Sequence, residues 1–165
     1  MKKLLVLLLG LLLALNLAAC QSGSNGRGAN LEGSLEEILA EIYKTAAVSE
    51  QFREYAKTGL QTTEINGENC EYHLGKAEIE FDAAIASEPI MSPSAYSLCL
   101  VRVKDGADIE QIKTDIKENA DPRKWVCVGV DPDNVIVDNV GDVIILIMSD
   151  QEGAALHEAF LALQA

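Results

Sequence analysis

The sequence predicts an α+β domain, a two-layer sandwich in which amphipathic helices cover one face of a mainly antiparallel sheet. Apolar segments of strand length follow one another through short turns, and strands joined by tight turns pair antiparallel. Other segments carry apolar residues at helical spacing. The chain has 165 residues, of which 48% are apolar, so it is long enough for one domain and too apolar for a disordered chain.

Side chains that cap helices precede each predicted helix. The caps are Ser34 with Glu37, then Ser49, Asp108, and Ser149 with Glu152. They predict helices over residues 35–47, from 49 to near 59, over 109–119 and after 149. Apolar residues recur every three or four positions in these segments, which indicates one buried face on each helix.

The predicted strands are apolar or alternate with a period of two. Residues 96–103 and 143–148 are apolar on both faces, which is typical of inner strands. Residues 78–85, 125–130 and 135–137 are the other expected strands. The segment from 60 to 86 is ambiguous, because a turn at Asn66-Gly67 predicts a hairpin of residues 62–65 with 70–74, while part of it could be helical.

The N-terminus has the features of a bacterial lipoprotein signal peptide. Lys2 and Lys3 precede an apolar stretch over residues 4–15, which is too short to span a bilayer. Leu17-Ala18-Ala19-Cys20 then resembles a lipobox, which implies lipidation of Cys20 and cleavage before it. An ordinary secretory signal or an uncleaved anchor is the alternative.

These features divide the chain into a signal peptide (1–19), a lipidated cysteine with a Gly-, Ser- and Asn-rich tether (20–33), and a single domain (34–165). Two acyl chains such as palmitate on Cys20 would anchor the protein stably at the extracytoplasmic face of the cell membrane. The mature chain keeps 11 of the 13 basic residues and all 26 acidic ones, a net charge of −15. This charge argues against nucleic acid as a partner and keeps the domain off an anionic lipid surface.

No catalytic or cofactor-binding motif is present in the sequence. His157-Glu158 begins a zinc-protease pattern, but position 161 is Leu, and His157 is expected to be exposed. His73 has no recognisable partner. The acidic turns over 131–134 and 138–142 do not match an EF-hand loop, so we predict turns and no metal site.

The cysteines and the single tryptophan leave alternatives open. Cys99 and Cys127 fall in two predicted strands, where they are either two buried thiols or a disulfide. Cys70 is expected to be the most exposed of the three. Trp125 is either a core residue or a binding aromatic.

Several short sequence motifs follow one another along the predicted domain. They are Ser87-Glu88-Pro89, residues 101–108, Asp121-Pro122-Arg123-Lys124-Trp125 and Gly141-Asp142. Over residues 71–163 this pattern resembles a family of small lipoproteins of clostridia and their relatives, defined only as a domain of unknown function. The resemblance implies a Gram-positive cell surface and brings no catalytic residues.

We therefore expect a membrane-anchored lipoprotein that is not an enzyme and that binds a protein or cell-wall partner. The alternative is a small-ligand or cation-binding lipoprotein associated with transport, and the third candidate is a hydrolase. An exposed apolar patch would favour the first function. A pocket with convergent polar groups would favour the second, and a buried His or Cys beside a carboxylate in a cleft the third.

Overall fold

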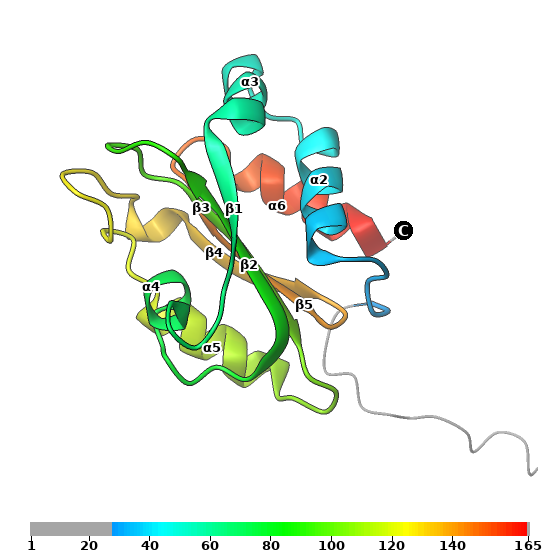
Figure 1. Ribbon diagram of the computed structural model, residues 1–165. Coiled ribbons are helices and arrows are strands. Elements are labelled where there is room, and N and C mark those ends of the chain that lie inside the picture. Colours follow the sequence, from blue (N-terminus) through cyan, green and yellow to red (C-terminus); the bar gives the residue numbers. More distant parts are fainter. Residues whose placement is uncertain (1–27, 165) are drawn as a thin grey trace, which may run out of the picture.

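A five-stranded antiparallel sheet in the order β1-β2-β3-β5-β4 forms the centre of the molecule (Figure 1). The computed structural model describes residues 28–164. The strands are β1 (Leu60–Glu64), β2 (Phe81–Pro89), β3 (Ser97–Val103), β4 (Val135–Val140) and β5 (Val143–Met148). The predicted α+β class with an antiparallel sheet is confirmed. Within residues 28–164, no helix is both long and apolar enough to cross a bilayer.

Helices cover both faces of this sheet, so the prediction of helices on one face was wrong. Figure 1 shows α2 (Leu35–Thr45) and α6 (Gly153–Leu161) on one side, and α4 (Cys70–Leu74) and α5 (Ile109–Asn119) on the other. The helix α3 (Glu50–Thr58) lies near the start of β1. The remaining elements are the short 3-10 helices η1 (Pro132–Asn134) and η2 (Ala162–Gln164).

The two inner strands explain why both faces need cover. Leu98 and Leu100 of β3 point into the core beneath α2 and α6, while Cys99 and Val101 point toward α4 and α5. β5 alternates in the same way, and all six of its residues are buried. Because apolar side chains stand on both faces, each face must be buried to remove them from water.

Two predicted strands are not strands. Residues 70–74 form α4, because the amides of Asn69 and Cys70 donate to the Asn66 carbonyl and begin a helical turn. Gly75 ends that helix in a left-handed conformation, at φ 83°. Residues 125–130 form a loop, and Cys127 has φ 63°, which a strand does not allow.

The predicted caps at Ser34–Glu37, Ser49 and Asp108 are confirmed, and Ser34 and Glu37 form a complete capping box. At the last helix only half of the box forms. The Glu152 amide donates to Ser149 Oγ, but the Glu152 carboxylate turns away and accepts from Ser49. β4 also extends beyond the predicted residue 137, so the turn to β5 lies at Gly141-Asp142.

The described end of the predicted tether is fixed to the domain. The Arg102 guanidinium donates to the carbonyls of Leu31 and Gly33, at 2.8 and 2.9 Å. Asp142 accepts from the Leu31 amide at 3.1 Å and forms an ion pair with Arg102. These residues, which we call the N-terminal clamp, place the chain entry beside the end of β3 and the start of β5. The folded body therefore begins before residue 34.

Candidate functional site

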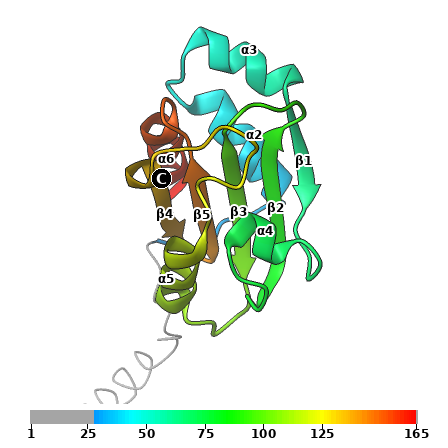
Figure 2. The same cartoon turned by 90° about the vertical axis from the view of Figure 1, so that its left-hand side faces the viewer.

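A groove opens at the opposite end of the strands, where β3 begins. Its volume is about 590 Å³. Phe52 and Tyr55 of α3 and Tyr96 before β3 supply its aromatic lining, and the loops around Val128 and Asp150 complete it. Figure 2 shows α3, the β2–β3 loop and the loop of residues 120–134 at this end of the sheet.

Two further hollows lie next to the groove and share lining residues with it. One, of about 650 Å³, lies beside Trp125 and shares Val128 and Gly129 with the groove. The other, of about 290 Å³, is lined by Ile90 and Met91 and shares Tyr55, Pro93 and Ser94 with the groove. We call these three neighbouring hollows the groove face.

Apolar side chains are exposed at both ends of the groove face. Met91 is 76% exposed and Ile90 54% exposed beside the smallest hollow. Val126 is 72% exposed and stands between Trp125 and Cys127, which both line the largest hollow. Exposed apolar groups gathered around a concave surface are typical of interaction sites.

The floor of the groove is aromatic and hydrogen-bonded. The Phe52 and Tyr96 ring centroids are 5.2 Å apart. The Tyr43 hydroxyl donates to Ser87 Oγ at 2.8 Å and lies 2.9 Å from the Tyr96 hydroxyl. Burial raises the pKa of both phenols, so both remain neutral hydrogen-bonding groups. The network ties α2, β2 and the segment before β3 together beneath the groove.

The charged residues of the central groove are all acidic. Its lining contains Asp150 and Glu152 and no lysine, arginine or histidine. Glu152 is 8% exposed and accepts from the Ser49 amide and from Ser49 Oγ, the latter at 2.5 Å. Asp150 accepts from the Asp131 amide at 2.9 Å. Hydrogen bonds fix both carboxylates, so negative charge is held at one wall of the groove.

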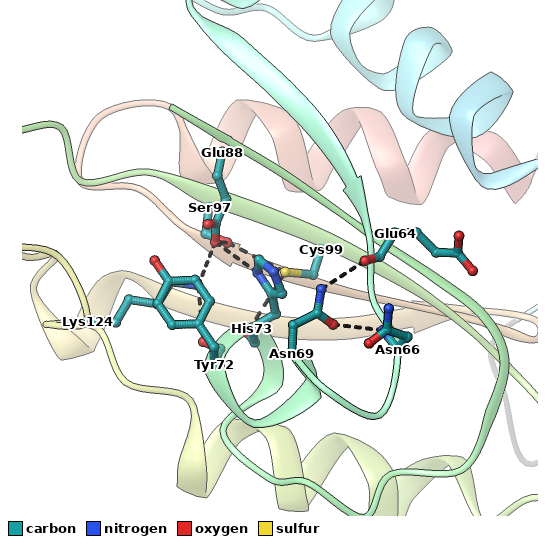
Figure 3. Close-up of polar contacts among 9 residues, drawn as sticks. All are labelled: Glu64, Asn66, Asn69, Tyr72, His73, Glu88, Ser97, Cys99 and Lys124. Atoms are coloured by element: carbon teal, nitrogen blue, oxygen red, sulfur yellow. Dashed lines mark hydrogen bonds and ion pairs between the residues drawn. The ribbon is translucent and has the colours of Figure 1, made fainter. Parts of the chain in front are cut away.

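A buried ion pair fastens the loop that carries Trp125 and Val128. Lys124 Nζ lies 2.5 Å from Glu88 Oε1, and these side chains are only 4% and 13% exposed (Figure 3). The same ammonium lies over the Tyr72 ring, 4.6 Å from its centroid. Lys124 therefore connects the loop to both β2 and α4.

Glu88 collects two further polar partners. Ser97 Oγ donates to Glu88 Oε1 at 2.7 Å, and His73 Nδ1 lies 3.4 Å from the same oxygen (Figure 3). Burial alone would raise the pKa of the Glu88 carboxyl. The His73 and Ser97 hydrogen bonds and the positive charge of Lys124 outweigh burial and hold that pKa at about 2. Glu88 is therefore a carboxylate at neutral pH.

His73, the Glu88 carboxylate, the Ser97 hydroxyl and the Cys99 thiol therefore lie together. They lie beneath the loop and not in the groove. Cys99 lies 3.5 Å from Ser97 Oγ and is fully buried, and burial raises the pKa of its thiol to about 11. The thiolate is the reactive form of cysteine, so Cys99 is held unreactive. Neither His73, Glu88 nor Lys124 lines any of the hollows of the groove face. The cluster supports the loop that forms the groove face.

The structure distributes the cysteines differently from the prediction. Cys20 lies outside the described residues. Cys70 is 1% exposed and packs in the core, so its predicted exposure was wrong. Cys127 is exposed in the loop, and the three described cysteines are free thiols. Of the pair considered for a disulfide, Cys99 is a buried thiol and Cys127 is not.

The other singled-out residues have local partners. His157 is half-buried rather than exposed, and its Nε2 lies 3.0 Å from Asp138 Oδ2. Trp125 is half-buried; it packs against the core and also lines a hollow. In the part of the chain that the structure describes, no group of three or more His, Cys, Asp or Glu side chains could hold a metal ion.

The sequence did not indicate that Glu88, His73 and Lys124 form one cluster. The three are far apart in the chain, and their meeting depends on α4 being helical and on residues 125–130 being a loop. Comparison of the chain with family models, with curated proteins and with solved structures finds no match.

Proposed function

We propose that this protein is a membrane-anchored, non-catalytic binding module that holds a segment of a partner protein on its groove face. One observation carries the proposal: three hollows lie side by side, sharing lining residues, with exposed apolar side chains at both ends of the row. Its aromatic lining offers the large, rigid contact area on which protein recognition depends.

The charge of the groove selects the chemistry of the partner. Two fixed carboxylates line its centre, and the whole chain has a formal net charge of −13. Complementary potentials favour encounter with the right partner and repel wrong ones. We therefore propose a partner segment in which apolar side chains are flanked by lysine or arginine.

The chain entry supports a membrane-anchored orientation. The N-terminal clamp at Arg102 and Asp142 lies at the end of β3, while Tyr96 places the groove before its start. Seven strand residues, or roughly 23 Å, separate the two ends. If Cys20 carries the lipid, the protein stands on its clamp end and turns its groove face away from the membrane.

Crosslinking of the lipidated protein on intact cells, followed by mass spectrometry, tests this function. We expect a reproducible, near-stoichiometric protein partner. The double variant Met91→Gln/Val126→Asn should lower its recovery by about tenfold, because the apolar contacts are lost. Glu80→Gln, at an exposed position outside the groove face, is the matched control. Recovery of the protein alone, or equal recovery from both variants, would contradict the proposal.

A further inference from the structure

The strand β1 ends the sheet on one side, and its outer edge has no neighbouring strand within residues 28–164. The sheet order places β1 beside β2 alone, and Figure 2 shows it at the border of the sheet. Four of its five residues are exposed, from Gln61 to Glu64. An open edge presents unpaired backbone donors and acceptors to any extended chain.

The register shows which backbone groups face outward. Ile65 donates to the Ala84 carbonyl and Ile90 donates to the Gly59 carbonyl, which makes these two cross-strand pairs hydrogen-bonded pairs. Hydrogen-bonded and non-hydrogen-bonded pairs alternate in an antiparallel ladder. It follows that Gln61 and Thr63 bond inward to β2, while Leu60, Thr62 and Glu64 point their amide and carbonyl groups outward.

One contact in the structure agrees with this assignment. Asn69 Nδ2 donates to the Glu64 carbonyl at 3.0 Å from outside the sheet (Figure 3). This side chain caps the far end of the edge. Within residues 28–164, no other hydrogen bond from outside the sheet reaches the backbone of Leu60, Thr62 or Glu64. Devices that block an edge, such as a proline, an inward charge or a bulge, are missing from β1 itself.

From this pattern we propose that β1 accepts an extended segment of a partner polypeptide as a sixth strand of the sheet. Only an extended backbone offers donors and acceptors at the two-residue repeat of Leu60, Thr62 and Glu64. The proposal concerns a surface outside the central groove and does not depend on the proposed function.

The occupant is a different polypeptide rather than a second copy of this chain. Two copies would each bring a net charge of −13, and both would place Glu64 at the shared edge. A segment that carries lysine or arginine among β-branched residues satisfies both the backbone and the charge.

A substitution at Thr62 can block the outer edge of β1 while its pairing with β2 is kept. The Thr62→Pro substitution removes one outward donor and places a ring against an incoming strand, while the inward bonds of Gln61 and Thr63 remain. Thr62→Val keeps the donor and is the matched control. A displayed library of short random peptides is the probe, with amide hydrogen exchange on the wild-type protein as an independent readout.

We expect the selected peptides to slow exchange at the amides of Leu60, Thr62 and Glu64. Thr62→Pro should weaken their binding about tenfold or more, and Thr62→Val should leave it unchanged. A library that yields no binder, or binders that protect other amides, would overturn the proposal. So would concentration-dependent self-association that Thr62→Pro abolishes, because the occupant would then be a second copy. The exchange experiment decides the question even if Thr62→Pro does not fold.

Discussion

Lys124 Nζ and Glu88 Oε1 lie 2.5 Å apart in a nearly water-free environment, although 36 positions separate the two residues. Glu88 belongs to β2, whose position the sheet determines. Lys124 belongs to a loop without regular secondary structure. The pair therefore fixes the loop, which forms one wall of the groove face, to the sheet.

Replacing Lys124 with methionine is expected to destabilise the protein by about 3 kcal/mol, because the buried Glu88 carboxylate loses its cation. Urea unfolding measures this change in the free energy of unfolding. Amide exchange over residues 121–131 should also accelerate.

The double variant Lys124→Met/Glu88→Gln should recover much of the loss, because no buried charge is left unpaired. Lys104→Met is the control, since that lysine is half exposed and its ion pair with Glu80 is at 3.8 Å. A Lys124→Met variant as stable as the control would show that the pair does not hold the loop.

Glu88 also predicts a specific loss of stability in acid. The pKa of its carboxyl is about 2 in the folded protein and 4.5 by its ordinary value. The stabilisation is therefore fully present above about pH 4.5 and is lost as the pH falls toward 2. Relative to Glu88→Gln, the wild type should lose up to about 3 kcal/mol over this interval. If the free energies of unfolding of the two proteins change by the same amount between about pH 5 and pH 2, the pKa of the Glu88 carboxyl is not lowered in the folded protein.

The cysteines are predicted to differ sharply in reactivity. Cys127 is exposed, whereas Cys70 and Cys99 are 1% and 0% exposed and burial raises the pKa of both thiols. Brief alkylation of the folded protein, mapped by mass spectrometry, should label Cys127 and spare the other two until urea is added. Cys127→Ser controls for background labelling. Rapid labelling of Cys99 in the folded state would show that the buried cluster opens.

The N-terminal clamp predicts local release when it is broken. Arg102→Ala removes the donors to the Leu31 and Gly33 carbonyls and should accelerate proteolysis before α2. The expected cost in stability is about 1.5–3 kcal/mol, the range for hydrogen bonds to charged groups. Lys57→Ala is the control because that side chain is 60% exposed. Unchanged cleavage in Arg102→Ala would remove the basis for the proposed orientation.

Regular elements with strong local signals could be predicted from the sequence. The capping box at Ser34 and the apolar runs of β3 and β5 agree with the structure because local propensity and tertiary burial favour the same outcome. Because these strands are apolar on both sides, the sequence also indicated that both faces of the sheet are covered. We predicted helices on one face only, because antiparallel sheets commonly have one face exposed to solvent.

The buried cluster could not be predicted because long-range contacts decide it. Residues 125–130 have the composition of a strand, but Lys124 draws the chain toward Glu88, and the Val130 amide donates to the Pro122 carbonyl at 2.8 Å. His73 has no partner nearby in the sequence, because Glu88 lies 15 positions away on β2 and the two residues meet only when α4 packs against the sheet. The groove face could not be predicted either, because the same loop forms one of its walls.

Site-specific photo-crosslinking on intact cells tests the central claim, that the groove face is the binding surface. A photoreactive residue replaces Gln51, which lines the groove and is exposed, or Asp105, an exposed residue in the turn after β3 at the clamp end. The account predicts one reproducible partner protein crosslinked from position 51 and little from position 105. Equal crosslinking from both positions, or a partner captured only from position 105, would contradict it.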